Sequence, residues 1–189
     1  ASYFSGEHPD WAADANPVCG VCYNDLNGTC KILDNLSART GFTFNFPTTA
    51  QWEYACRAGS TTSFPASKTN PSGFAYVENT DTYNKVNVIG NTNAKGLGKP
   101  VAVGSYECNT WGLYDMIGNQ LEPTLDWYST TFQYEGQDPT GPETGTYRDG
   151  RGGSWSHQVY QSRTTSHNLY YNSGTRAYYM GCRLAIQLQ

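Results

Sequence analysis

The chain has 189 residues, enough for one domain with a substantial hydrophobic core and short for two. Its net charge of -4 is spread along the sequence without a basic stripe, which argues against a nucleic-acid-binding protein. No apolar run approaches the roughly 20 residues that a membrane span needs, so we expect no transmembrane segment in this chain.

Hydrophobic residues make up 38% of the chain and charged residues 15%, and both fractions are modest. Gly, Tyr, Asn, Thr and Ser make up the difference, and these residues favour turns and short strands over long helices. The composition therefore predicts a loop-rich fold with short strands.

The first predicted helix follows an irregular, proline-containing stretch, residues 1–18. Asn24 or Asp25 can cap its N-terminus, because a short polar side chain accepts a hydrogen bond from the free backbone N–H groups there. Apolar residues then recur at spacings of four, three and three and form one stripe: Leu26, Cys30, Leu33 and Leu36. We expect this helix to end at Thr40 and Gly41.

A short strand and a second helix are expected on the two sides of Pro47. Alternating aromatic residues mark the strand: Phe42, Phe44 and Phe46. In the helix, Thr48 followed three residues later by Gln51 forms a capping box, and Gly59 closes the C-terminus. The apolar face of this helix is formed by Trp52, Ala55 and Cys56.

Residues 60–100 are rich in Ser, Thr, Asn, Gly and Lys, with scattered aromatic residues. A connection of this length usually carries function or flexibility. Residues 101–106 are then expected to form a short strand.

The last fifth of the chain, residues 151–185, has the composition of a binding surface. It contains no Asp, Glu or Lys and consists mostly of Tyr, Ser, Thr, Asn, Gln, His and Gly. Tyr offers rigid amphipathic area at a small entropic cost, while Ser, Asn and Gly adapt their hydrogen bonds to a ligand. The alternative interpretation is a tyrosine-rich sheet face or an ordinary polar loop.

Six cysteines occur, at positions 19, 22, 30, 56, 108 and 182. Cys19 and Cys22 have redox or zinc spacing, but a zinc site needs a second pair of ligands at a suitable distance. Only Cys30 follows nearby. We expect buried free thiols or one disulfide rather than a metal.

Four ordered motifs carry a resemblance to a known family. They are F-P-T-T-A-Q-W-E-Y-A-C-R-A-G at 46–59, N-T-W-G-L-Y-D-M-I-G-N-Q-L-E at 109–122, R-G-G-S-W at 151–155 and G-C-R-L-A at 181–185. Together they resemble the formylglycine-generating-enzyme, or sulfatase-modifying-factor, family. The resemblance implies an α+β, C-type lectin-like fold, loop-rich, with two helices and short antiparallel strands. It implies a single domain over residues 1–189, in which the family's opening strand and helix are missing or replaced.

The family's oxidase activity, as the resemblance implies it, uses two cysteine thiolates downstream of the R-G-G-S-W motif to bind copper and activate oxygen. Soft thiolates select Cu(I) and can exchange with a substrate cysteine. The two matching positions are Ser162 and His167, and neither is a thiolate. Cys182 stands where the family's G-F-R motif places a packed Phe. We therefore expect no formylglycine-generating activity.

The chain resembles more specifically the variable proteins of diversity-generating retroelements, in which Asn codons of a C-terminal region, here residues 151–189, are mutated at adenines. The ligand-binding residues that this resemblance implies are Ser156, His157, Gln158, Tyr160, His167, Asn168, Tyr170, Tyr171, Asn172, Tyr178 and Tyr179. Gln158 fits least well, because Gln is not a simple product of adenine mutation in an Asn codon. Positions expected to stay fixed are Arg151, Gly152, Gly153, Trp155, Arg163, Arg176, Gly181 and Arg183.

The tyrosine pairs at 170–171 and 178–179 have a structural alternative. Adjacent residues on a strand face opposite sides, so one ring of each pair would be buried.

The resemblance also implies a structural Ca2+ site made of hard oxygen ligands. Its predicted ligands are Asp115, the backbone carbonyls of Gly118 and Gln120, and Glu122. The alternative makes Asp115 a turn former and Glu122 an ion-pair partner of Arg151 or Arg183. No other cofactor is expected.

The leading hypothesis is a non-enzymatic ligand-binding protein that acts as a receptor or in surface recognition. Its partner would be a protein on another cell or virus, and its location a cell or virion surface. The alternative is a metal-dependent oxidoreductase of the formylglycine-generating type, or a degenerate homologue of one.

Overall fold

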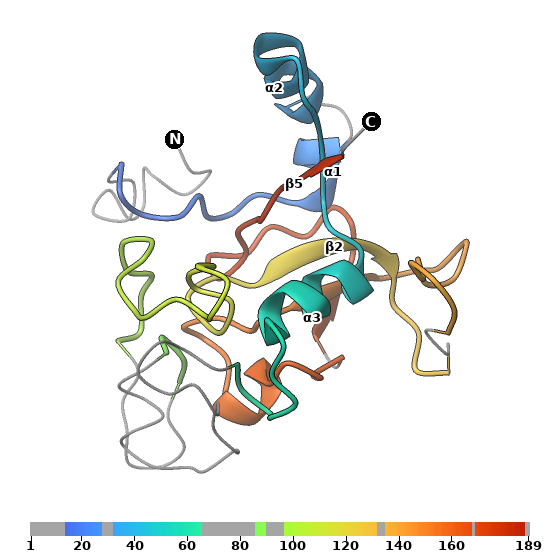
Figure 1. Cartoon of the computed structure of the whole chain (residues 1–189). Helices are drawn as coiled ribbons and strands as arrows, with labels where there is room; N and C mark the ends of the chain where they lie inside the picture. Colours follow the sequence, from blue (N-terminus) through green and yellow to red (C-terminus); the bar gives the residue numbers. More distant parts are fainter. Residues whose placement is uncertain are drawn as a thin grey trace.

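A computed structural model describes residues 14–27, 32–65, 86–89, 97–131, 135–167 and 169–187. The elements in chain order are α1 (Tyr23–Asn27), α2 (Ile32–Thr40), β1 (Thr43–Asn45), α3 (Thr49–Arg57), β2 (Glu122–Trp127), β3 (Arg148–Arg151), the 3-10 helix η2 (Val159–Ser162), β4 (Leu169–Tyr171) and β5 (Ala185–Gln187). Long irregular segments join these short elements (Figure 1). The expected loop-rich α+β architecture is confirmed.

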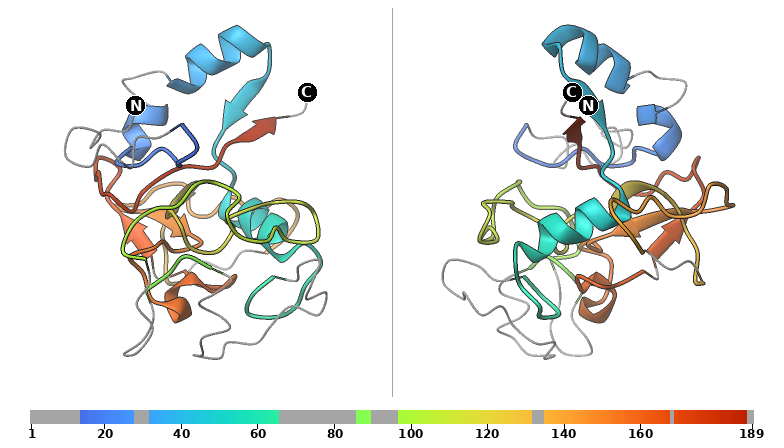
Figure 2. Two further views of the ribbon diagram at one scale, coloured as in Figure 1. Left: turned by 90° about the vertical axis from the view of Figure 1, so that its left-hand side faces the viewer. Right: turned by 45° about the vertical axis from the view of Figure 1, so that its right-hand side comes forward.

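Two small antiparallel sheets organise the chain. β2, β3 and β4 form one sheet in that order, and β1 pairs with β5 in the other, with Phe44 opposite Ile186. Figures 1 and 2 show α1, α2 and the β1–β5 pair on one side of the molecule, while α3 lies across β2 in its body. The last fifth of the chain supplies β4 and β5, so it belongs to both sheets.

Helix α3 begins and ends as its sequence predicts. The Thr48 side chain accepts a hydrogen bond from the Gln51 backbone, and the Gln51 side chain accepts one from the Thr48 backbone, which completes the capping box. At the C-terminus Ala58 adopts a left-handed conformation with φ 46°, and Gly59 follows with φ 88°. A glycine is favoured there because a Cβ is strained at such angles.

Two hydrophobic clusters are found among the described residues. One lies between the N-terminal segment and the sheets: Val21, Tyr23, Leu26, Leu33, Phe46, Leu121, Leu169, Tyr171 and Met180. The other lies beneath α3: Trp52, Cys56, Phe64, Val86, Val88, Met116, Ile117 and Val159. Residues of the last fifth enter both clusters, so that segment is anchored in the core at several points.

Two predicted elements differ from the structure. The single first helix is two helices, α1 and α2, and residues 28–31 between them lie outside the described part of the chain. Residues 101–106 form turns rather than a strand. Their backbone groups bond to a turn partner and to distant segments instead of a neighbouring strand: the Ser105 N–H bonds to the Ala102 carbonyl and the Val101 N–H bonds to the Asn119 side chain.

Within the part of the chain that the structure describes, no helix has the length and apolar character required to cross a membrane.

Candidate ligand-binding surface and its buried frame

Two consecutive glycines turn the chain sharply at the start of the last fifth. Gly152 has φ 81° and Gly153 has φ 69°, both in the left-handed region. A Cβ on Gly153 would lie 2.0 Å from the Ser162 Oγ, and one on Gly152 would lie 2.9 Å from the Met116 carbonyl oxygen. These contacts leave no room for a side chain, so the backbone path requires glycine at both positions.

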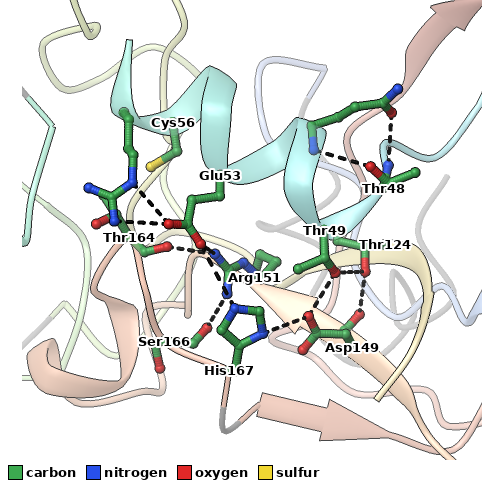
Figure 3. A network of polar contacts seen from close by, with 12 residues as sticks. Thr48, Thr49, Glu53, Cys56, Thr124, Asp149, Arg151, Thr164, Ser166 and His167 are labelled. Carbon is green, nitrogen blue, oxygen red and sulfur yellow. Dashed lines mark hydrogen bonds and ion pairs between the residues drawn. The ribbon is translucent and has the colours of Figure 1, made fainter. Parts of the chain in front are cut away.

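Arg151 holds the following loop in place from inside the protein. Its side chain is fully buried and donates hydrogen bonds to the carbonyl oxygens of Thr164, at 2.6 Å, and Ser166, at 2.7 Å. Its guanidinium also pairs with the Glu53 carboxylate of α3 at 2.5 Å (Figure 3). A buried charge needs such compensation, and here one side chain joins β3, α3 and residues 164–166.

A second polar network lies beside this arginine. Thr49, at the start of α3, donates its backbone N–H to Asp126 and its hydroxyl to Asp149, each at 2.7 Å. Thr124 lies 2.8 Å from the Thr49 hydroxyl (Figure 3). Burial, together with the neighbouring Asp149 carboxylate, raises the pKa of Asp126 to about 6. Two buried acids, one on β2 and one on β3, therefore lie next to the start of α3.

Ion pairs fix the far end of the segment. Arg176 pairs with Asp25 of α1 through two donor atoms. Arg183 pairs with Glu122 at 2.8 Å, and the Trp52 indole donates to the same carboxylate at 2.6 Å. The predicted alternative role of Glu122 as a partner of Arg183 is thus confirmed.

We call the buried residues that hold this segment the frame. It consists of Arg151, Gly152, Gly153, Ser154, Ser162, Thr164, Tyr171, Met180 and Gly181.

The predicted ligand-binding residues are mostly accessible. Tyr160 is 38% exposed, Tyr170 is 50% exposed and Asn172 is also exposed. Six others are intermediate in burial: Ser156, His157, Gln158, His167, Tyr178 and Tyr179. We call these exposed and intermediate residues the contact positions. Asn168 lies outside the described residues.

Tyr171 does not fit its predicted role as a ligand-binding residue. It is buried in the core at 6% exposure, while its neighbour Tyr170 points outward, as strand alternation requires. The alternative of one buried ring in this pair is therefore right, and Tyr171 belongs to the frame. In the pair Tyr178 and Tyr179, both residues are half-buried.

The contact positions do not all lie together. His157 meets Tyr179 edge to face, with ring centroids 5.0 Å apart. The His157 Nδ1 lies 2.7 Å from the Ser154 hydroxyl, and burial lowers the pKa of His157 to about 4, so this imidazole is neutral at physiological pH. Gln158 forms an isolated parallel β-bridge with Ile89. His157 and Gln158 are thus partly structural.

Tyr170 instead joins two tyrosines that the sequence did not single out. Its ring stacks on Tyr128 at 4.3 Å and lies 5.1 Å from Tyr147. Tyr128 and Tyr147 lie outside residues 151–185, and no motif marked them. Only the pairing of β2, β3 and β4 brings the three rings together.

The positions that match the family's copper-binding cysteines have other roles. Ser162 is fully buried, packs against Gly153 and bonds to the Gln158 carbonyl at 3.3 Å. His167 lies between two carboxylates, 3.4 Å from Asp149 and 3.8 Å from Glu53 (Figure 3).

The described cysteines do not replace these missing thiolates. Cys19, Cys22, Cys56 and Cys108 are buried free thiols and Cys182 is a half-buried one, in agreement with one of the two predicted states. Burial raises the pKa of Cys182 to about 12 and that of Cys56 further still. Both thiols are therefore protonated at neutral pH.

The predicted calcium ligands are only partly suited to a cation. One Asp115 oxygen accepts from the Gly104 N–H, and the other is buried with no hydrogen-bond partner among the described residues. Both Glu122 oxygens, in contrast, are taken by Arg183 and Trp52. The described segments contain no group of three or more His, Cys, Asp or Glu side chains that could hold a metal ion. The Glu122 carboxylate does not fit the role in this arrangement, so calcium stays a prediction.

Comparisons with known proteins agree on the family. Residues 4–188 match the family model of the sulfatase-modifying factor enzyme 1-like domain. The formylglycine-generating enzyme of Mus musculus is 32% identical over 143 residues, which cover 74% of this chain and 35% of the mouse protein. The enzyme of Streptomyces coelicolor is 37% identical over 163 residues, which cover 78% of this chain and 45% of that protein. The chain thus spans less than half the length of these relatives.

Solved structures agree on the fold. Treponema denticola variable protein 1 superposes with a TM-score of 0.74 at 21% identity, over 97% of this chain and 76% of that one. PvdO from Pseudomonas aeruginosa gives a TM-score of 0.73 at 25% identity, over 93% of this chain and 64% of that one. The same scaffold therefore occurs in a protein named for its variability and in relatives named as enzymes.

Proposed function

The chain belongs to the sulfatase-modifying factor enzyme 1-like domain family, and from this premise we propose that it is a non-enzymatic ligand-binding protein. Its binding surface consists of the contact positions between Ser156 and Tyr179. The ligand is a protein on another cell or virus, and the chain acts at a cell or virion surface.

The observation that carries this proposal is the state of Ser162 and His167. Copper-thiolate chemistry needs two accessible soft ligands, and here one position is a buried hydroxyl and the other an imidazole beside two carboxylates. A serine hydroxyl is a poor Cu(I) ligand. The nearby Cys56 is fully buried, and its thiol points toward the Met116 carbonyl in the core.

The exposed tyrosines support a role in ligand recognition rather than copper chemistry. Tyr160 and Tyr170 present large amphipathic rings at 38% and 50% exposure on a backbone that the frame fixes. A few such anchors usually supply most of the energy of a protein interface. Changes at exposed positions alter stability by only about 0.5 kcal/mol, so specificity can change while the fold persists.

We further propose that a retroelement diversifies this surface. The test is the nucleotide sequence around the gene, read for a reverse transcriptase and a near-repeat of codons 151–185. The repeat should differ from the gene at its adenines, in codons of the contact positions, and match it at the codons for Arg151, Gly152, Gly153 and Gly181. Differences spread evenly over both sets would argue against diversification.

An assay for the enzymatic alternative is equally direct. The purified chain is incubated with Cu(I), oxygen and a peptide that carries the cysteine of a sulfatase motif, and the peptide mass is followed. We expect no conversion of cysteine to formylglycine. The double variant Ser162→Cys/His167→Cys provides a comparison in which both family thiols are restored. Conversion by the wild-type chain would overturn the non-enzymatic proposal.

A further inference from the structure

Three tyrosines from different parts of the chain form one exposed aromatic surface. We call Tyr128, Tyr147 and Tyr170 the tyrosine platform. Tyr128 and Tyr170 stack with an interplanar angle of 26°, and Tyr147 inclines toward Tyr170 at 54°. Tyr147 is 42% exposed and Tyr170 is 50% exposed. A hydrogen bond from the Tyr128 N–H to the Tyr147 carbonyl fixes the two scaffold residues relative to each other.

The face of the sheet that carries Tyr171 packs against the core. Arg148 stacks over the Trp127 ring at 3.5 Å and over the Tyr23 ring at 4.1 Å, and it pairs in register with the buried Tyr171. Cross-strand pairs on that face stabilise the sheet. The tyrosine platform therefore exposes aromatic area beyond what the core uses, and such area marks an interaction surface.

The chain segment that joins two rings of the platform is acidic. Residues 128–147 contain Glu135, Asp138 and Glu143, all exposed, and no Lys or Arg. Asp149 is buried directly opposite Tyr170 in the sheet register. Burial raises the pKa of Tyr128, and Tyr170 and Asp149 add to the rise, so the Asp149 carboxylate lies within electrostatic range of the platform. An aromatic ring face also attracts cations through its quadrupole. The ring faces and the Asp149 carboxylate thus favour the same kind of ligand group.

We propose that the tyrosine platform docks a lysine- or arginine-bearing segment of a protein ligand, with the cationic side chain against the rings of Tyr147 and Tyr170. The proposal rests on the ligand-binding function proposed above and specifies its partner as a basic one. It also makes the binding surface composite. Tyr170 comes from the last fifth of the chain, while Tyr128 and Tyr147 come from the scaffold and stay the same when that segment changes.

The test uses the full chain and a labelled, end-blocked peptide of alternating lysine and glycine. A peptide with glutamine in place of lysine is the neutral comparison, and binding is followed by fluorescence anisotropy at low salt. The lysine peptide should bind and the glutamine peptide should not. The Tyr147→Leu variant should weaken binding about three- to fivefold, the size expected for an exposed cation–π contact. Tyr147→Phe, which keeps a ring face, should stay within about twofold of wild type.

Two further variants keep the test decisive. Tyr170→Leu removes another ring of the platform and should weaken binding to a similar degree if Tyr147→Leu does not fold. Tyr54→Leu removes a ring that is 69% exposed but lies on α3 against Trp111, and it should leave binding unchanged. Equal binding of the two peptides, or equal losses in the Tyr54 and platform variants, would overturn the proposal. Neither result would bear on the cysteine-peptide assay or the codon comparison, which test the ligand-binding function itself.

Discussion

The frame and the contact positions share one stretch of chain but differ in what they contact. Tyr171 is 6% exposed in the core, and Tyr170, the next residue back, is 50% exposed on the opposite face. Arg151 bonds to three partners inside the protein, whereas Tyr160 presents its ring to solvent. This segment therefore obtains its conformation from a small set of buried residues. The residues between are thereby free to serve recognition.

The largest expected effect is at Gly153. Gly153→Ala forces a Cβ to within 2.0 Å of the Ser162 hydroxyl at a φ of 69°, which combines steric overlap with backbone strain. We expect a loss of about 3–5 kcal/mol in the free energy of unfolding, measured by chemical denaturation. Gly174→Ala is the matched control, because its Cβ would meet no atom closer than 3.9 Å. A similar loss in both variants would show that the Gly153 turn has no special role.

Tyr170 and Tyr171 provide the simplest comparison of a contact position with a frame residue. Tyr171→Ser removes a buried ring and should cost about 3 kcal/mol of unfolding free energy. Tyr170→Ser removes only ring contacts with Tyr128 and Tyr147 and should cost about 1 kcal/mol. Thermal or urea unfolding of the two variants provides the measurement. The assignment of Tyr171 to the frame is wrong if the two losses are equal.

Two arginines share Glu53 but differ in burial, so they test whether the frame depends on its buried charge. Arg151→Met leaves the carbonyl oxygens of Thr164 and Ser166 without their donor and should cost about 2–3 kcal/mol. Arg57→Met removes a partly exposed pair on α3 and should cost less than about 1 kcal/mol. The free energies of unfolding of both variants, determined in the same buffer, decide the point. A larger loss for Arg57→Met would contradict the proposed role of Arg151.

The last prediction concerns pH. Burial lowers the pKa of His157 to about 4, below its ordinary value of 6.5. Between these two values the unfolded chain takes up a proton that the folded protein does not, so the free energy of unfolding falls as the pH drops from about 6.5 toward 4. His157→Gln should flatten this part of the stability profile, measured by urea unfolding between pH 4 and 7.

Asp126 supplies the control of opposite sign. Its pKa is raised to about 6, so the folded protein takes up a proton at Asp126 before the unfolded chain does. This protonation adds stability as the pH falls from 6 toward 3.8. Asp126→Asn should therefore lose stability more steeply on acidification than wild type. If neither substitution alters the profile, the two groups are not buried as described.

Local signals allowed much of the fold to be predicted from the sequence. The capping box of Thr48 and Gln51 is a contact within one turn, and four ordered motifs fixed the family. The split of the first helix and the turns at residues 101–106 depend on contacts from elsewhere, such as the Asn119 side chain that binds the Val101 N–H. Propensity alone cannot include such contacts.

The site was predictable only in part for the same reason. Composition predicted a binding segment at residues 151–185, and alternation allowed for one buried ring in the pair at 170 and 171. The partner of Arg151 lies 98 residues away in α3, and the scaffold tyrosines reach Tyr170 only through strand pairing. No periodicity within the segment carries that information.

One measurement tests the division into frame and contact surface most directly. Six accessible positions are randomised together in a display library: Ser156, Tyr160, Tyr170, Asn172, Tyr178 and Tyr179. A second library randomises six frame positions: Arg151, Gly152, Gly153, Ser154, Thr164 and Gly181. Protease resistance of the displayed chains reports the folded fraction of each library. Most members of the first library should stay folded and most of the second should not. Equal loss of folding in both would contradict the division.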